Sequence, residues 1–283
     1  MLGSTLCIKY HDSYQINALH RDLKCLAPCR GDFSLDLNSL PELTKIFDSI
    51  KPNLVIHCAG NINMELCEKY PELAYAANAK CTENIAQLCG DKIKLVYIST
   101  DQVYGNDINH SEYNSNLLPI NQYGKTKFIG ENLAMEYSKD CIIIRTNIFG
   151  WNVKPGRVSS AEWMYHSLKN DKPITLFTDY TFSPIYTKIL GEIILQLVKN
   201  DFSGVINVGS SEPCTKYEFG IHLAQKFKYD LSLINQGSVE EHSSMVKRAK
   251  DLTMDTDKIT ELDIAVPAFS RSIESFSQDC PYN

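Results

Sequence analysis

A tyrosine and a lysine four residues apart are the side chains of this sequence best suited to proton transfer. Tyr123 and Lys127 precede the segment 128–135, which has a helical pattern, so both side chains are expected on one face of one helix. A phenol with an unperturbed pKa near ~10 is a poor acid at neutral pH, but a neighbouring ammonium favours the phenolate and lowers that pKa. Tyr123 is therefore a candidate general acid.

A predicted strand end supplies a hydroxyl group for the same chemistry. The apolar run 95–98 stops at Ser99 and Thr100, which predicts a buried strand that opens into a loop. Ligands bind at this end of the strands in parallel α/β sheets, so Thr100 can share a substrate oxygen with the phenol. A chance Tyr-x-x-x-Lys pair is the alternative, and it is disfavoured because Asn121 and Gly124 frame the tyrosine beside this strand end.

Together, Thr100, Tyr123 and Lys127 match the Ser/Thr, Tyr and Lys triad of the extended short-chain dehydrogenases/reductases. The resemblance covers the chain from Met1 to about Phe276 and is greatest to the sugar-nucleotide reductases similar to dTDP-4-dehydrorhamnose reductase. It implies that NADPH or NADH delivers a hydride to the ketone of a 4-keto sugar nucleotide while Tyr123 supplies the proton. The reaction would serve deoxysugar or surface-polysaccharide synthesis.

The same resemblance implies a set of cofactor-binding residues. Arg21 follows the predicted strand 14–19, where an arginine can pair with a 2′-phosphate and favour NADPH over NADH; a solvated arginine explains this residue nearly as well. Asp36, in the predicted strand exit 31–37, is expected beside the adenine, but it could equally cap the helix 41–47. The expected cofactor contacts are Gly3, Arg21, Asp36, Leu37, Cys58, Ala59, Gly60, Asn78, Ser99, Tyr123 and Lys127.

The expected substrate contacts come from three places in the chain. Asp101 and Gln102 follow the catalytic threonine, and Asn147 ends the predicted strand 140–146, whose carboxyl end faces the same crevice. Resembling reductases of the rhamnose precursor tend to carry Thr-Ser-Trp at this second strand end, so the different residues here leave the identity of the sugar open. Arg248 matches a basic residue that the family directs at the diphosphate, with a solvated loop as an equal alternative.

Strands alternate with helices along most of the chain. This alternation predicts an α/β fold with a doubly wound parallel sheet and a smaller, interwoven α/β substrate lobe. We expect a dinucleotide-binding domain over 1–150 with 186–208, and the substrate lobe over 151–185 with 209–283.

The amino terminus carries only part of the expected phosphate-binding turn. Gly3 corresponds to the last glycine of a G-x-x-G-x-x-G turn, so the preceding strand and the first two glycines are expected to be encoded upstream of Met1; a simple loop glycine is the alternative. A sheet without its first strand leaves ladder groups unpaired, at about 1–3 kcal/mol for each buried group. The 283 residues alone are therefore expected to bind the cofactor weakly.

Composition and charge exclude several classes of function. The net charge of −6 and the lack of a basic run argue against a nucleic-acid surface. No apolar run approaches ~18 residues, and the start has no signal-peptide pattern, so neither a membrane span nor secretion is expected. The ten cysteines are scattered without Cys-x-x-Cys, which favours reduced thiols in the cytoplasm and no metal site. A homodimer is compatible with these features, and the sequence does not fix the oligomeric state.

Two alternatives to a reductase stay open. One is a non-catalytic regulatory or binding subunit of the same ancestry, since the regulatory subunit of methionine adenosyltransferase is similar to this reductase family. The incomplete phosphate turn favours this alternative and the intact triad disfavours it. The other is an NAD-dependent epimerase or dehydratase; the pair Asp101 and Gln102 resembles the reductases more than the dehydratases, which usually carry an acidic pair there.

Overall fold

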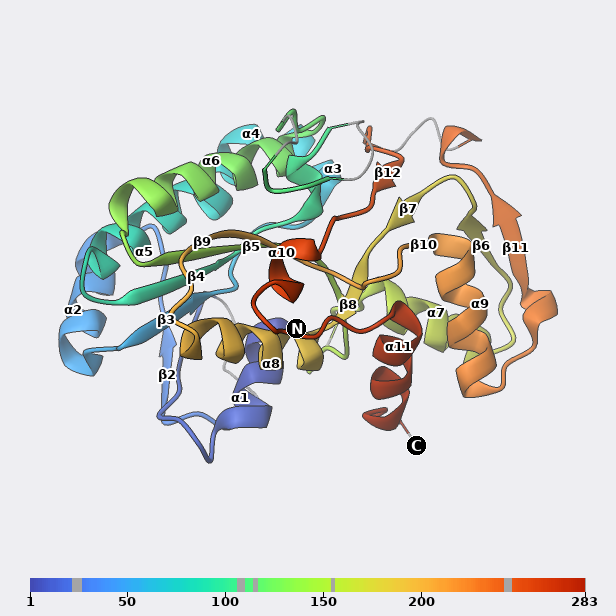
Figure 1. Ribbon diagram of the computed structural model, residues 1–283, viewed down its shortest axis with the longest axis horizontal. Coiled ribbons are helices and arrows are strands. Elements are labelled where there is room, and N and C mark those ends of the chain that lie inside the picture. Colours follow the sequence, from blue (N-terminus) through green and yellow to red (C-terminus); the bar gives the residue numbers. More distant parts are fainter. Residues whose placement is uncertain (22–26, 106–109, 114–116, 154–155, 242–245, 283) are drawn as a thin grey trace.

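The centre of the computed structural model is a parallel sheet of five strands (Figure 1). The model describes residues 1–21, 27–105, 110–113, 117–153, 156–241 and 246–282. The strands of the sheet are β3 (Leu54–His57), β4 (Lys94–Ile98), β5 (Cys141–Phe149), β8 (Pro184–Tyr186) and β9 (Gly204–Val208). Their order is β3-β4-β5-β8, and β9 also pairs with β5. All these pairings are parallel, which confirms the predicted α/β class.

Alternate residues of the central strands pack on opposite faces of the sheet. Helices α2 (Leu40–Ile50), α5 (Cys81–Cys89) and α6 (Gln122–Tyr137) pack on one face, and α1 (Leu2–Tyr10) and α8 (Thr187–Lys199) pack on the other. Leu95 and Tyr97 of β4 pack beneath α5 and α6. Val96 and Ile98 pack against α1 and α8. Burial of both faces explains why these strands are apolar throughout rather than alternating.

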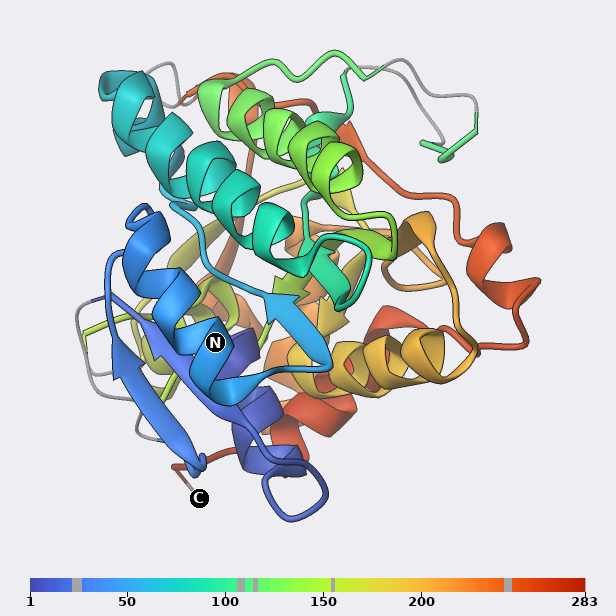
Figure 2. The ribbon, with the colours of Figure 1, turned by 90° about the vertical axis from the view of Figure 1, so that its left-hand side faces the viewer.

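A separate two-stranded parallel sheet lies before the central sheet in the sequence. β1 (Asn17–His20) pairs with β2 (Gly31–Ser34), and both strands cover less than the segments predicted for them. Figure 2 shows the two strands side by side, below α2 (Leu40–Ile50). Within the described residues, β1 shares no ladder with β3. Among the described residues the parallel strands therefore form two separate sheets, a division that the sequence analysis did not predict.

The helical region between β3 and β4 is broken where proline predicts a break. α3 (Met64–Lys69) ends at Tyr70, and α4 (Pro71–Tyr75) restarts with the proline in its first turn. A π-helical turn, Ala76–Lys80, follows before α5. This π turn was not predicted, and it contains the fully buried Asn78.

A second lobe, rich in aromatic residues, is built mainly from the carboxyl-terminal half of the chain and lies on the right in Figure 1. Its helices are α7 (Ser160–Lys169), α9 (Lys216–Phe227) and α11 (Phe269–Gln278), whereas the intervening α10 (Asp257–Thr260) packs on the central sheet beside β9. Its strands are β6 (Ile174–Phe177), β7 (Thr181–Phe182), β10 (Cys214–Thr215), β11 (Ile234–Gly237) and β12 (Asp251–Leu252). α9 begins with the predicted capping box of Thr215 and Glu218. Between the lobe segments the chain returns through β8, α8 and β9 to the central sheet, and β8 spans the expected boundary near residue 186.

Membrane-spanning helices and clusters of metal-ligating side chains are both absent from the described residues. None of the helices that they form is long and apolar enough to cross a membrane. Within the same part of the chain, no group of three or more His, Cys, Asp or Glu side chains is arranged to hold a metal ion.

Candidate active site

The start of α6 is fixed against the turn that follows β4. Asn121 is the N-cap residue, and its side-chain oxygen accepts a hydrogen bond from the Gly124 amide at 2.9 Å. Its side-chain nitrogen donates to Gln102 Oε1 at 3.3 Å and to the Lys247 carbonyl at 3.2 Å. A Cβ atom at Gly124 would lie 2.2 Å from the Gln102 carbonyl oxygen, so only glycine allows this approach. The site thus forms where α6, the β4 turn and the second lobe meet.

At this point the structure brings together Tyr123 and Thr100. The Tyr123 phenol is buried, and Thr100 lies close enough to act on its pKa. Burial raises the pKa of Tyr123 above its ordinary value, and the neighbouring Thr100 offsets only part of this effect. The expectation of a lowered phenol pKa was therefore wrong, because helical spacing does not reveal how deeply a side chain is buried.

Lys127 lies one turn after Tyr123 on α6, and residues of β4 hold its side chain. Its ammonium donates to the Ile98 carbonyl at 2.7 Å and lies 4.0 Å from the centre of the Tyr97 ring. Burial lowers the pKa of Lys127 to about 8, while Cys81 and Glu131 act in the opposite direction. The Lys127 side chain is therefore buried and oriented by β4.

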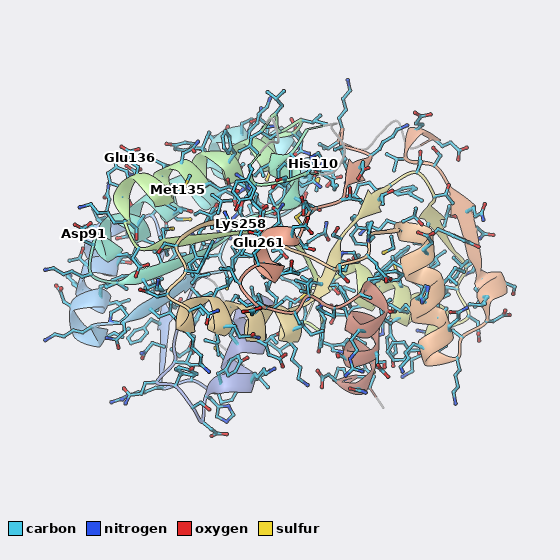
Figure 3. The ribbon with its side chains drawn as sticks, viewed as in Figure 1. Asp91, His110, Met135, Glu136, Lys258 and Glu261 are labelled. Carbon is cyan, nitrogen blue, oxygen red and sulfur yellow. The ribbon has the colours of Figure 1, made fainter. Side chains whose placement is uncertain are left out.

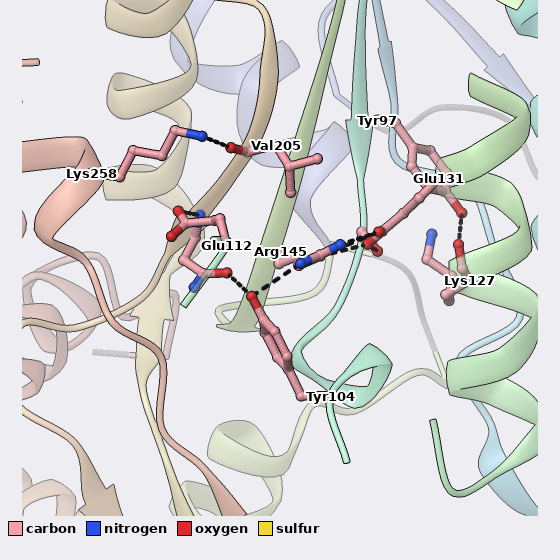
Figure 4. A network of polar contacts seen from close by, with 10 residues as sticks. Tyr97, Tyr104, Glu112, Lys127, Glu131, Arg145, Val205 and Lys258 are labelled. Carbon is pink, nitrogen blue, oxygen red and sulfur yellow. Dashed lines mark hydrogen bonds and ion pairs between the residues drawn. The ribbon is translucent and has the colours of Figure 1, made fainter. Parts of the chain in front are cut away.

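A buried ion pair, which the sequence analysis missed, lies behind these residues (Figure 4). Arg145 of β5 donates from Nη2 to Glu131 Oε2 at 2.7 Å and from Nε to both carboxylate oxygens. Ser99 donates to Glu131 Oε1 at 2.5 Å, and Arg145 Nη1 donates to the Tyr104 hydroxyl at 3.2 Å. Glu131 follows Lys127 at i+4 on α6, which is the one sequence signal that could have pointed to it.

Several of the expected cofactor contacts gather at the carboxyl end of β3. Cys58 and Gly60 are exposed there, with Ala59 between them. A Cβ atom added to Gly3 would lie 3.9 Å from Cys58 Cβ, so the start of α1 is next to this strand end. Asn78 Oδ1 accepts from the Asn61 amide at 2.7 Å, and Asn78 Nδ2 donates to Thr126 Oγ1 at 3.0 Å. Asn78 thus ties the loop after β3 to α6.

The other expected cofactor contacts lie around β1 and β2. Arg21 is exposed, and its carbonyl accepts from Ser34 Oγ at 3.0 Å. Asp36 is also exposed and accepts from the Asn38 amide at 3.0 Å. It does not cap the next helix, since Ser39 is the N-cap residue of α2. Leu37 is partly buried, and its carbonyl accepts from Asn84 Nδ2 at 3.1 Å.

Three of the expected substrate residues form one hydrogen-bonded group beside Thr100. Asn147 donates to Asp101 Oδ2 at 2.5 Å, and Gln102 Nε2 is 3.4 Å from Asp101 Oδ1. Thr100 Oγ1 donates to Asp101 Oδ1 at 3.1 Å, and burial raises the pKa of Asp101. Asp101 therefore orients the threonine hydroxyl.

The fourth expected substrate residue, Arg248, comes from the second lobe. Its Nη2 is 3.2 Å from Glu65 Oε1 of α3. Its Nε is buried and has no hydrogen-bond partner among the described residues. Tyr180 and Lys216, which the sequence analysis did not single out as site residues, lie close enough for Arg248 to influence their pKa values.

A comparison with protein families identifies the group to which these residues belong. The family model described as the RmlD substrate binding domain matches residues 1–281. The chain belongs to this family. Its α/β sheet is thus that of an RmlD-like protein, a family whose members include sugar-nucleotide reductases.

Individual relatives of this RmlD-like chain are distant in sequence but similar in structure. The solved dTDP-4-dehydrorhamnose reductase of Bacillus anthracis, in complex with NADP, is 26% identical with a TM-score of 0.81, over 87% of each chain. A probable low-salt glycan biosynthesis reductase of Haloferax volcanii is 25% identical over 80% of this chain and 76% of its own. Methionine adenosyltransferase 2 subunit beta of Xenopus laevis is 26% identical over 68% of this chain and 60% of its own length.

Proposed function

We propose that this RmlD-like protein is an NAD(P)H-dependent reductase of a 4-keto sugar nucleotide, in deoxysugar or surface-polysaccharide synthesis. The observation that carries the proposal is the placement of the buried Tyr123 phenol beside Thr100, one helical turn from Lys127, at the carboxyl end of β4. Relatives named dTDP-4-dehydrorhamnose reductase support the same substrate class. Substrate binding is assigned to Asp101, Gln102, Asn147 and Arg248.

The residues at the end of β3 fit a dinucleotide. Cys58, Ala59 and Gly60 are small, and the position of a Cβ on Gly3 meets only Cys58 within 4 Å. Small side chains let a cofactor approach the backbone, and the amino-terminal end of α1 favours an anion beside Gly3. A bound nicotinamide would supply the hydride, with Lys127 and Ser99 at its end of the site and Asp36 and Leu37 at the adenine end.

The chain itself supplies the proton for the reaction. The raised pKa of Tyr123 keeps the phenol protonated at neutral pH, so it can donate to the carbonyl oxygen as negative charge develops there. Thr100 lies beside the phenol, and its hydroxyl, which donates to Asp101, would turn to the same substrate oxygen when the substrate binds. Asp101 fixes the Thr100 hydroxyl, and the Ile98 carbonyl fixes Lys127.

Replacing Tyr123 by phenylalanine tests this proposal. Loss of a general acid typically lowers the rate by ~10²–10⁴. We therefore expect Tyr123→Phe to lower kcat for NADPH-dependent reduction of dTDP-4-dehydrorhamnose by this factor, while NADPH binding followed by fluorescence stays close to that of the unmutated protein. The matched control is Tyr113→Phe, since Tyr113 is exposed. Unchanged turnover of Tyr123→Phe would remove Tyr123 from the mechanism.

The cofactor preference, the roles of the two parts of the chain, the cellular location and the oligomeric state are further proposals. NADPH is preferred to NADH through Arg21, which follows β1 on the side expected for the adenosine ribose. Residues 1–150 with 186–208 hold the cofactor, and residues 151–185 with 209–283 hold the substrate. The protein acts in the cytoplasm, a proposal supported by the scattered cysteines and the lack of a Cys-x-x-Cys motif in the sequence. A homodimer stays a prediction, to be tested by sedimentation.

A regulatory or binding subunit is the second candidate. Its support is the similarity to methionine adenosyltransferase 2 subunit beta, together with the separation of β1 from β3 within the described chain. A non-catalytic subunit has no need for a phenol beside Thr100, so the geometry favours the reductase. NADPH binding without reduction of any 4-keto sugar nucleotide would favour the subunit instead.

A further inference from the structure

A partly buried ammonium group without a carboxylate partner lies on the substrate side of the site. Lys216 is the first residue of α9, and its Nζ is 3.5 Å from the centre of the Phe182 ring and 5.5 Å from that of Tyr180. No described Asp or Glu oxygen lies within 4.0 Å of this nitrogen, whereas Lys226 on the same helix pairs with Glu274. Burying an ammonium without an anion is unfavourable, so a function that uses the charge is expected.

The small three-stranded sheet of the second lobe places Arg248 near this ammonium. β7 pairs with β10 on one side and with β12 on the other. The Lys216 amide donates to the Tyr180 carbonyl at 3.2 Å, and the Thr181 amide donates to the Lys250 carbonyl at 2.8 Å. Lys216 and the segment that carries Arg248 therefore flank the same end of β7.

Both cations are connected to the catalytic residues. The Tyr180 hydroxyl lies 3.4 Å from Gln102 Nε2, and Gln102 is also in contact with Asp101. The Lys247 carbonyl, next to Arg248, accepts from the side chain of Asn121, the N-cap residue of the catalytic helix. Through these contacts the ammonium and the guanidinium lie on the second-lobe side of the residues around Thr100 and Tyr123.

We propose that Lys216 and Arg248 together bind the diphosphate of the nucleotide-sugar substrate, with Lys216 as a specificity-determining residue of the second lobe. This inference rests on the proposed reductase function and adds a second cation to its substrate site. A diphosphate carries several negative charges and many acceptor oxygens, which suit an ammonium with three donors and the unpartnered Nε of Arg248. The rings of Phe182 and Tyr180 hold the ammonium in place for this contact.

The charge state of Lys216 gives the proposal a second readout. Burial lowers the pKa of Lys216 to about 8; Asp101 and Cys214 act in the opposite direction, and Arg248 adds to the lowering. The ammonium is present below this pH and is lost as pH rises through it. Diphosphate affinity should therefore weaken above about pH 8, and an arginine at this position should remove that alkaline loss because arginine stays charged.

The experiment uses calorimetric titration of thymidine diphosphate and uridine diphosphate into the full chain with NADP present, at pH 7 and pH 9. Charge-assisted hydrogen bonds of the usual strength predict that Lys216→Met raises Kd about 10- to 100-fold at pH 7. Lys216→Arg should bind within about threefold of the unmutated chain and lose the difference between the two pH values. Lys226→Met, in the same helix, is the matched control and should change neither quantity.

The outcomes separate this inference from the reductase function. If Lys216→Met binds both nucleotides as tightly as Lys226→Met does, Lys216 only packs on Phe182 and the inference is overturned while reduction can still occur. If binding depends on Lys216 but no 4-keto sugar nucleotide is reduced, the diphosphate site stands and the reductase function is lost. If the unmutated chain binds neither nucleotide, both ideas are overturned.

Discussion

At the scale of the residue, the pair of Glu131 and Arg145 links the catalytic helix to the central strand of the sheet. Both side chains are buried, and the carboxylate also accepts from Ser99, the residue before Thr100. Glu131 is among the groups that raise the pKa of Lys127 against the effect of burial. One carboxylate therefore positions the end of β4 and helps to keep the Lys127 ammonium charged.

Replacing Glu131 by glutamine should strongly destabilise the protein. Removing one partner of a buried ion pair leaves the other charge uncompensated, at a cost of about 3–5 kcal/mol in the free energy of unfolding. Denaturant unfolding measures this change directly. The control is Glu136→Gln on the same helix, where the side chain is exposed (Figure 3), and its effect should stay within about 0.5 kcal/mol. Equal stability of the two variants would show that the Arg145 charge is solvated.

Arg21 carries the prediction about cofactor choice. If its guanidinium pairs with the 2′-phosphate, Arg21→Ala should lower the preference for NADPH over NADH by about 10- to 100-fold, the usual value of a charge-assisted contact. The measurement is kcat/KM with each cofactor. Arg30→Ala is the control, because Arg30 is also exposed and directly precedes β2. The same preference in all three proteins would leave Arg21 a surface residue.

At the scale of the element, the amino-terminal end of α6 is the most constrained part of the site. The Asn121 cap and the close approach of Gly124 to the Gln102 carbonyl fix where Tyr123 lies relative to Thr100. A helix placed this tightly leaves no room for adjustment, because backbone atoms rather than flexible side chains form the contact.

Gly124→Ala should therefore displace the start of α6. The added methyl group would lie 2.2 Å from the Gln102 carbonyl oxygen, and overpacking of this kind costs about 1–3 kcal/mol. We expect kcat to fall much more than the melting temperature, since the shift acts on the contact between Thr100 and Tyr123. Lys125→Ala is the control, because Lys125 is exposed on the next position of the helix. Full activity of Gly124→Ala would show that the turn after β4 moves with the helix.

The sequence predicted most of the elements but only part of the site. Apolar runs and proline located β3, β4, β5 and the break at Tyr70, since these signals are local. The Tyr123 and Lys127 pair was found for the same reason. Glu131 with Arg145, and Lys216 with Arg248, were missed as pairs because their partners come from separate segments. The direction of the Tyr123 pKa was wrong because burial depends on the whole fold.

At the scale of the whole molecule, Asn207 of β9 joins three distant segments. Its side-chain oxygen accepts from the Tyr104 hydroxyl at 2.7 Å, and its nitrogen donates to the carbonyls of His110 and Asp255. The ring of His110 stacks on that of Tyr104 at 4.5 Å between centres. The buried Asn207 side chain therefore connects the central sheet to the segment after β4 and to the segment around Asp255.

Asn207→Ala should weaken the joint between the two halves of the molecule. The change leaves the buried Tyr104 hydroxyl without its acceptor and the Asp255 carbonyl without its donor, each at about 1–3 kcal/mol, while the His110 carbonyl keeps its bond from the Asp255 amide. We therefore expect the free energy of unfolding to fall by at least about 2 kcal/mol. Asn235→Ala, at an exposed position of β11, should have little effect. Hydrogen exchange near Tyr104 and Asp255 should speed up together; faster exchange at only one of them would contradict a shared joint.

The course of the chain through the sheet has a consequence for protein synthesis. β5 pairs with β4 on one edge, but its pairing with β9, which begins with Ile142 and Gly204, has to wait until the first part of the second lobe has been synthesised. At typical rates of ~5–20 residues per second, this wait lasts roughly 3–12 s. The central sheet therefore cannot be completed before that part of the second lobe is made, and the nascent chain exposes the apolar second edge of β5 during that time. This interval is the stage at which a chaperone would be most useful to the protein.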